Sequence, residues 1–316
     1  MTGAGVLTVG EGLAVLGALD SGPLELRSSL SFTTGGAEGN VAIGLSRLGT
    51  PVTWVGRVGD DQIGRRVVRE LCAEGVDVRA ILAPEPTGLL VKERLAGGRT
   101  SVSYYRRGSA GSGLSPDDLT DVDPADYALV HVTGITPALS HSARNAILAL
   151  AERTRAAGVA LSFDVNHRSS LWLPADAAPV YRSLIALSDV VFAGADEAAL
   201  VLGLSDAGPD ELAAGIAALG PGEVVIKLGA DGCFAWCDGE IHREPAIRVE
   251  VVDTVGAGDA FVAGWLAERI AGESVAGRAR TAVAVAAAQC LVAGDWEGLP
   301  RRAELDSPAD GDPVRR

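Results

Sequence analysis

The sequence predicts an α/β fold in which a mostly parallel sheet is covered by helices on both faces. Short apolar runs alternate with longer segments of helical period along most of the 316 residues. This spacing favours right-handed crossovers from strand to helix to strand. Hydrophobic residues make up 47% of the chain with only five Phe and five Trp, so the apolar content is mostly aliphatic, as in buried parallel strands and their covering helices.

The predicted elements follow one another in a regular order. Apolar runs of strand length lie at 6–10, 52–58, 129–134, 160–165, 189–193, 224–228 and 233–237. Helical stretches lie at 39–48, 63–74, 140–157, 210–219 and 257–271. Ligands of such sheets bind beyond the carboxyl ends of the strands, so motif residues at strand exits are the first candidates for a site.

Two segments do not fit the alternation. Residues 13–34 and 87–106 have β-rich sequences without a helical period, including Leu24-Glu25-Leu26, and they predict extra strands outside the main sheet. An ordinary surface hairpin is the alternative for each. Residues 301–316 are rich in Pro, Asp and Arg and predict a disordered tail. The sequence therefore predicts one domain over residues 1–300.

Charge and composition exclude several classes of partner. The formal charge of −14 argues against nucleic acid, because no basic block supplies counterion release. No apolar stretch is long enough to span a bilayer, and residues 1–30 lack the pattern of a secretory signal, so a cytoplasmic protein is expected. The four Cys lack paired C-x-x-C spacing for zinc and are expected to be free thiols.

One motif combines two acidic residues with a turn of small residues. The run Asp-Thr-Val-Gly-Ala-Gly-Asp spans residues 253–259 and opens the last predicted helix. The backbone N–H groups of Gly256, Ala257 and Gly258 would point together at the positive end of the helix dipole and form an anion site. Asp259 could then accept a hydroxyl proton during phosphoryl transfer. A plain helix N-terminus with an Asp in its first turn fits these residues equally well.

The motif lies inside a longer string with a family resemblance. Asp-Thr-Val-Gly-Ala-Gly-Asp-Ala-Phe at 253–261 resembles the C-terminal signature of the ribokinase-like (PfkB) sugar kinases. Gly-Gly-Ala-Glu-Gly-Asn-Val-Ala at 35–42 and Gly-Arg-Val-Gly-Asp-Asp at 56–61 resemble the family's other signature, in the same order. The resemblance runs from about residue 6 to about residue 292. It implies a ribokinase-like fold with a Rossmann-type sheet and a small β lid, ATP and Mg²⁺ as cofactors, and Asp259 as catalytic base.

The second irregular segment points to one branch of that family. Tyr-Tyr-Arg-Arg-Gly-Ser-Ala-Gly-Ser at 104–112 resembles the 2-keto-3-deoxygluconate kinases, as do the runs at 131–139 and 164–168. A sugar acid carries a carboxylate, and a planar guanidinium binds a carboxylate through two hydrogen bonds. Arg106 and Arg168 are therefore the candidates for an acid clamp. A solvated surface charge is the alternative for each.

The branch resemblance implies a full set of sugar-binding residues. They are Gly35, Gly36, Asn40, Tyr104, Arg106, Ile135 and Arg168. The two glycines also suit a turn that needs positive φ, and Asn40 suits a helix cap. One position departs from the branch, since Leu90 stands where a Tyr is often found. This departure leaves the identity of the sugar acid open.

The nucleotide side resembles the family less closely. Lys-Leu-Gly-Ala-Asp-Gly at 227–232 resembles its nucleotide loop, although a plain turn would use the same glycines. The family's Asn-x-x-Glu corresponds to residues 194–197, where Glu197 is retained and Gly194 replaces the Asn. Glu197 would act on Mg²⁺ through water. Asp253 would position the loop or a monovalent cation such as K⁺. The implied cofactor-binding residues are Lys227, Gly229, Gly232, Asp253 and Glu197.

These observations lead to one main prediction and two alternatives. The main prediction is an ATP-dependent kinase that phosphorylates the terminal hydroxyl of 2-keto-3-deoxygluconate or a related keto-deoxy sugar acid. A family kinase of a neutral sugar such as fructose or ribose is favoured if Arg106 faces solvent, and a non-catalytic sugar-binding regulator is the third possibility. No Walker A sequence occurs, which argues against a P-loop kinase. Because the family's lid often pairs with another subunit, a homo-oligomer formed through the lid is expected.

Overall fold

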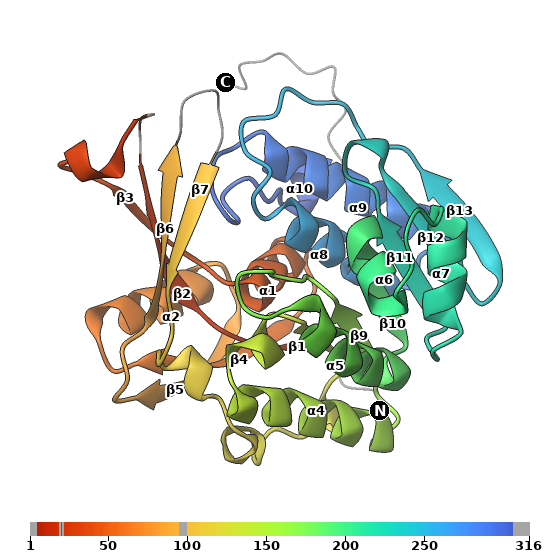
Figure 1. Ribbon diagram of the computed structural model, residues 1–316, viewed down its shortest axis with the longest axis horizontal. Helices are drawn as coiled ribbons and strands as arrows, with labels where there is room; N and C mark the ends of the chain where they lie inside the picture. The colour runs from red at the N-terminus through yellow and green to blue at the C-terminus, as the bar shows by residue number, and fades with distance from the viewer. Residues whose placement is uncertain (1–4, 19, 21, 95–99, 306–316) are drawn as a thin grey trace.

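A nine-stranded sheet forms the centre of the molecule in the computed structural model, which describes residues 5–18, 20, 22–94 and 100–305 (Figure 1). The strand order is β13-β12-β11-β10-β9-β8-β1-β4-β5. Neighbouring strands from β11 to β5 pair in parallel, whereas β12 and β13 pair antiparallel at one edge. The bounds are β1 Val6–Val9, β4 Val52–Gly59, β5 Asp77–Ala83, β8 Leu129–Thr133, β9 Ala160–Asp164, β10 Val190–Gly194, β11 Glu223–Lys227, β12 Cys233–Cys237 and β13 Glu240–Glu244.

Helices cover both faces of this sheet, as the sequence predicts. One layer packs through apolar residues of α1 Ala37–Arg47, α2 Gln62–Ala73, α8 Ala257–Ile270 and α9 Val275–Cys290. The other layer packs through α4 His141–Ala156, α5 Pro174–Leu187, α6 Ala195–Leu202 and α7 Pro209–Ala217. Two short helices, α3 Thr136–Leu139 and α10 Arg302–Leu305, complete the set in the described residues. No helix among those residues has the length and apolar character needed to cross a lipid bilayer.

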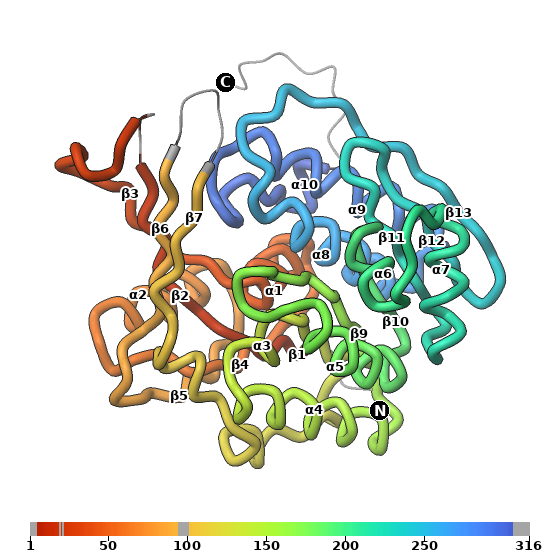
Figure 2. Tube along the Cα trace, in the orientation of Figure 1, coloured from red at the N-terminus to blue at the C-terminus, as the bar shows by residue number. Residues whose placement is uncertain are grey.

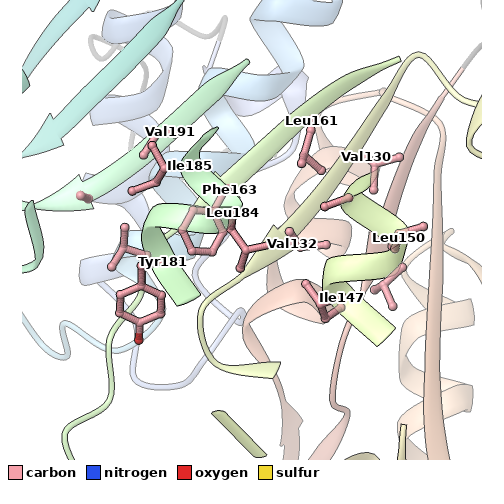
Figure 3. Close-up of a cluster of buried hydrophobic side chains, with 14 of the residues drawn as sticks. Val130, Val132, Ile147, Leu150, Leu161, Phe163, Tyr181, Leu184, Ile185 and Val191 are labelled. Carbon is pink, nitrogen blue, oxygen red and sulfur yellow. The ribbon is translucent and has the colours of Figure 1, made fainter. Parts of the chain in front are cut away.

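The strands supply a separate apolar core to each helical layer because successive side chains point to opposite faces. On β8, Leu129 belongs to the core under α1 and α8, whereas Val130 and Val132 belong to the core under α4 and α5. Figure 3 shows this second core, in which side chains of β8 and β9 meet those of α4 and α5. Full burial of one such aliphatic side chain stabilises the fold by about 1.5–3 kcal/mol.

A second, four-stranded sheet stands apart from the main sheet (Figure 2). Its order is β3-β2-β6-β7, with bounds β2 Leu13–Gly17, β3 Ser31–Gly35, β6 Gly88–Arg94 and β7 Thr100–Tyr105. We call it the small sheet. Both irregular segments of the sequence contribute two strands to it, which confirms the prediction of extra strands there. The expected strand at Leu24–Leu26 is wrong, because these residues form a short 3₁₀ turn.

The remaining differences from the sequence prediction have local causes. Each predicted strand overlaps an observed one, but β5 and β13 were not predicted because both lie at sheet edges and are partly exposed. Helices α5 and α6 were not predicted, and of α9 only a helical region at 284–289 was expected, because its Ala- and Val-rich sequence has little amphipathic contrast. The predicted disordered tail begins too early, since residues 302–305 form α10 and Arg302 pairs with Glu268. The rest of the tail, residues 306–316, lies outside the described residues.

Candidate active site

Two cavities meet beyond the carboxyl ends of the central strands. The first, about 380 Å³, lies between the small sheet and the N-terminus of α8, and we call it the polar cavity. The second, about 570 Å³, lies between the 229–232 turn and α9, and we call it the apolar cavity. Lys227, Thr254 and Gly258 line both. Another cavity, between α5 and α6, is lined by none of the predicted site residues.

Asp259 lies at the wall of the polar cavity, in the first turn of α8. Its side chain is buried and accepts a hydrogen bond from Asn40 Nδ2 at 2.8 Å and one from Asn166 Nδ2 at 3.2 Å. Burial raises the pKa of Asp259, although the Asn40 hydrogen bond and the charges of Arg168 and Lys227 oppose this shift. The carboxylate is thus oriented by two amides and is more basic than an exposed Asp.

The turn before Asp259 has a backbone that only glycine adopts readily. Gly256 caps α8 with φ of 76°, and a Cβ there would lie 1.9 Å from the carbonyl oxygen of Asp295. The first N–H groups of a helix have no intrahelical partner and can bind an anion. The Ala257 N–H donates to Thr254 O at 3.3 Å, a long contact that the turn itself makes. Gly258 is exposed to both cavities.

Arg106 also lines the polar cavity and is buried, with 7% of its surface exposed. Its Nη1 donates to Glu11 Oε2 at 3.0 Å, and its guanidinium lies 4.2 Å from the centroid of the Tyr104 ring. The Nε and Nη2 atoms of Arg106 are buried without a hydrogen-bond partner. Buried donors without a partner carry a desolvation cost, so these two atoms call for an explanation.

The other predicted sugar residues divide into two groups. Gly36, Asn40, Ile135 and Arg168 line the polar cavity, and Arg168 is exposed there. Leu90, which departs from the branch pattern, lines it too. Gly35 does not line the polar cavity. A Cβ at Gly35 would lie 3.0 Å from Val15 Cγ2 and 3.1 Å from Asp295 Oδ1. Gly35 therefore lies where neighbouring side chains pack closely against the backbone.

Several residues of the polar cavity were missed by sequence reasoning. Glu38 is buried, accepts hydrogen bonds from the hydroxyls of Thr133 and Thr136, and has a pKa raised by burial to about 7. Glu11, Lys92 and Asp295 also line the cavity. Only the period-2 placement of Lys92 and Leu90 on one face of β6 was a usable signal in the sequence. Asn166 was quoted in a motif, but its contact with Asp259 was not predicted.

The predicted nucleotide loop borders the apolar cavity. Lys227 ends β11 and donates to both oxygens of Asp164, at 2.7 and 2.9 Å. Gly229 and Gly232 have φ of 58° and 95°, and a Cβ at Gly232 would lie 2.0 Å from Glu244 O. Most of the remaining lining is small or aliphatic, including Val249, Val283, Ala286, Ala287 and Cys290, and Arg248 and Phe261 line the cavity too. This surface suits a flat apolar group next to an anion site.

Glu197 and Asp253 have structural contacts in the molecule. Glu197 accepts the backbone N–H of Gly194 at 2.6 Å and that of His167 at 2.8 Å, so it caps α6. Asp253 accepts the N–H of Val255 at 3.1 Å and holds the turn before α8. Across residues 5–18, 20, 22–94 and 100–305, no group of three or more acidic, His or Cys side chains could hold a metal ion.

The fold and the two cavities define a class of α/β proteins in which a small second sheet borders a polar cavity at the carboxyl ends of a parallel sheet. A model described as "pfkB family carbohydrate kinase" matches residues 5–302. The chain is 38% identical over 311 residues to a 2-dehydro-3-deoxygluconokinase of Bacillus subtilis, covering 95% of this chain and 94% of that one. It is 36% identical to a 2-dehydro-3-deoxygalactonokinase of Haloferax volcanii, covering 92% of each.

The solved structures agree with this assignment. A candidate ribokinase II of Escherichia coli, in complex with ATP and Mg²⁺, superposes with a TM-score of 0.88 at 26% identity, covering 96% of this chain and 98% of that one. The chain belongs to the PfkB family of carbohydrate kinases. The ribokinase-like fold and the kinase class inferred from the sequence are therefore confirmed.

Proposed function

We propose that this kinase transfers the γ-phosphate of ATP to the terminal hydroxyl of 2-keto-3-deoxygluconate or a close keto-deoxy sugar acid. The observation that carries the proposal is the polar cavity itself. It has a buried, oriented carboxylate at the end that meets the apolar cavity and a buried guanidinium with two unpartnered N–H donors near the small sheet. The names of two relatives, which are kinases of such acids, support the same substrate class.

Recognition of the sugar acid would rest on Arg106 and Arg168. The free Nε and Nη2 donors of Arg106 match the two oxygens of a carboxylate, and the ring of Tyr104 holds the guanidinium plane. Arg168 would approach from the exposed side of the cavity. The neutral-sugar alternative was to be favoured if Arg106 faced solvent, and the burial of Arg106 gives it no such support. Gly36, Asn40 and Ile135 would contact the remaining sugar atoms, with Gly35 supporting them from behind.

Phosphoryl transfer would use Asp259 as the base. Asn40 and Asn166 each hold one carboxylate oxygen of Asp259. One of these two oxygens would take the proton of the attacking hydroxyl. The N–H groups at the start of α8, from Gly256 to Gly258, would stabilise the charge that develops on the transferred phosphoryl. Gly258 lies where the two cavities join, which suits the position of the γ-phosphate.

The apolar cavity would hold ATP. Its aliphatic lining would contact the adenine, while Lys227, Gly229 and Gly232 would border the phosphates and the ribose. Mg²⁺ would be held by the phosphates of the nucleotide and by water molecules, as this ion usually is. Glu197 would then bind the ion through water, and the bound ion would neutralise phosphate charge. We also propose K⁺ near Asp253 as an activating ion, which replacement of K⁺ by Na⁺ in the assay tests.

The small sheet would act as a lid over the sugar. Its strands contribute Leu13, Leu90, Lys92, Val102 and Tyr104 to the wall of the polar cavity. Closure over the sugar would exclude water and suppress ATP hydrolysis. Phe32 and Tyr105 expose 38% and 66% of their surface on this sheet, which supports a homo-oligomer formed through it; light scattering of the purified chain tests this.

One assay tests the proposed substrate. ADP release from Mg-ATP is measured with 2-keto-3-deoxygluconate, 2-keto-3-deoxygalactonate, gluconate, fructose and ribose. We expect turnover of the keto-deoxy acids with a kcat/KM at least about a hundredfold above that for fructose or ribose, because a site with buried charged groups rejects a ligand that leaves them unpaired. Turnover of fructose or ribose alone would refute the acid clamp and leave the kinase class intact.

A further inference from the structure

A short segment after α9 ties the small sheet to the turn before Asp259. Residues 295–297, which we call the strap, contact the small sheet at three places. Lys92 Nζ donates to Asp295 Oδ2 at 2.6 Å, Trp296 Nε1 donates to Thr34 O at 3.0 Å, and Thr33 Oγ1 donates to Glu297 Oε1 at 2.5 Å. Strands β3 and β6 are therefore both joined to the strap. Figure 1 shows the chain after α9 running beside the small sheet.

The same strap packs against the turn at residues 255–258, just before Asp259. We call these residues the catalytic turn. A Cβ at Gly256 would lie 1.9 Å from Asp295 O, so these two backbones touch where α8 begins. Gln289 supports this contact, because its Nε2 donates to Val255 O at 3.2 Å and to Gly294 O at 3.0 Å. Movement of Asp295 would therefore displace the turn that carries the predicted anion-binding N–H groups.

One of the three contacts between the strap and the small sheet is the pair Lys92–Asp295. Both residues of this pair also line the polar cavity. Their side chains are 10% and 9% exposed, so the ion pair is almost fully buried. A buried pair adds little net stability compared with an apolar pair, but removal of one partner leaves a costly unpaired charge. Such a pair fixes a geometry, and here it fixes strand β6 relative to the start of α8.

We infer that Lys92 is a positioning residue for phosphoryl transfer: through Asp295 it sets the catalytic turn and holds the small sheet over the acceptor cavity. This inference rests on the proposed function for its kinetic consequence, but its structural consequence does not depend on the sugar. Loss of the Lys92 ammonium frees β6 and the turn together. Sugar-dependent turnover then falls and ATP hydrolysis without sugar rises, because the cavity no longer excludes water reliably.

Hydrogen exchange of the ligand-free protein tests the structural link. In Lys92→Met we expect amides of residues 88–94 and of residues 255–260 both to exchange about tenfold faster than in the wild type. Lys92→Arg keeps the charge and should restore most of the protection in both segments. Arg66→Met is the matched control, since the hydrogen bonds of Arg66 go to Glu70 and to Phe32 of the same sheet. Unchanged exchange at 255–260 in Lys92→Met, or an equal increase in Arg66→Met, would overturn the inference.

Kinetics then separate positioning from general loss of stability. We expect Lys92→Met to lower kcat for the sugar acid by about tenfold with the KM for ATP within about twofold, and Arg66→Met to leave both near the wild type. An unchanged kcat in Lys92→Met would count against the inference. If the wild type itself phosphorylates none of the keto-deoxy acids, the proposed substrate is wrong, and the exchange experiment alone decides the role of Lys92.

Discussion

The two cavities that meet at Gly258 are built in different ways. The polar cavity is lined by charged and amide side chains from both sheets, and several of them are fixed by pairing, as in Arg106 with Glu11 and Lys92 with Asp295. The apolar cavity is lined mainly by glycine, alanine and valine, with backbone turns at positive φ at Gly229 and Gly232. With the ligands proposed above, one cavity would recognise its ligand through side-chain charge and the other through shape and backbone.

This difference predicts how each site responds to substitution. In the polar cavity a single change removes a hydrogen bond or leaves a partner charge buried, which has a large and ligand-specific effect. In the apolar cavity a single change alters volume, and its effect is moderate. The catalytic turn lies between the two cavities, so a change there should affect turnover without affecting binding in either.

The largest effect is expected at the junction of the cavities. Asp259→Asn keeps the shape and one acceptor oxygen but removes the proton acceptor. We expect kcat to fall by about 10²–10⁴-fold, the usual contribution of a general base, while the dissociation constants for sugar acid and ATP stay within about threefold. Steady-state kinetics and calorimetric titration measure the two quantities. Turnover close to the wild type would contradict the role of Asp259 as base.

Arg106 tests the charge recognition of the polar cavity. Arg106→Met should lower kcat/KM for the sugar acid by about a hundredfold, because charge-assisted hydrogen bonds to the ligand carboxylate are lost, with little change in the KM for ATP.

The Arg106→Met experiment requires a control, because this substitution leaves the partner of Arg106, Glu11, buried without a cation. The double variant Arg106→Met with Glu11→Gln removes this unpaired charge and should recover stability without recovering sugar affinity. Recovery of sugar affinity in the double variant would show that the loss came from Glu11 and not from a missing clamp.

A volume change sharpens the contrast on the other side. Ala287→Leu adds three carbon atoms to the α9 wall of the apolar cavity. We expect the KM for ATP to rise by about tenfold and the dissociation constant of the sugar acid to stay unchanged, since overpacking costs about 1–3 kcal/mol. Ala284→Leu, on the same helix but outside the lining, is the control. An equal effect on both ligands would mean that the cavities are not separate.

The free energy of unfolding should depend on pH through the protonation of Glu38. Burial raises its pKa from 4.5 to about 7, so the folded state holds a proton that the unfolded state releases. Its contribution to stability is fully present below about pH 4.5 and is lost as the pH rises to about 7, and it is on the order of 3 kcal/mol.

Glu38→Gln isolates this contribution from other buried acids. Burial also raises the pKa of Asp164 and of Asp295, each to about 6, so both add a slope of the same sign in the wild type. Urea denaturation between pH 4.5 and 8 should show a shallower loss of stability in Glu38→Gln than in the wild type. Parallel curves for the two proteins would contradict the raised pKa of Glu38.

Much of the fold followed from local sequence patterns. The alternation of apolar strands with helical segments predicted the main sheet and its two helical layers, because burial on both faces requires continuous apolar strands. The segments 13–34 and 87–106 lacked a helical period, and each contributes two strands to the small sheet. The motif at 253–259 predicted the helix start and the exposed glycine turn, since both depend on residues adjacent in the chain.

The sequence by itself determined which residue types were available for the site, including Asp259, Arg106 and Arg168. Only the tertiary structure decided how they are paired, because those partners come from distant segments. Asn40 lies 219 residues from Asp259 along the chain, Glu11 lies 95 from Arg106, and Lys92 lies 203 from Asp295. No local period encodes such contacts. They arise when the small sheet, the start of α8 and the strap pack against one another, and burial then sets the charges that the cavity presents.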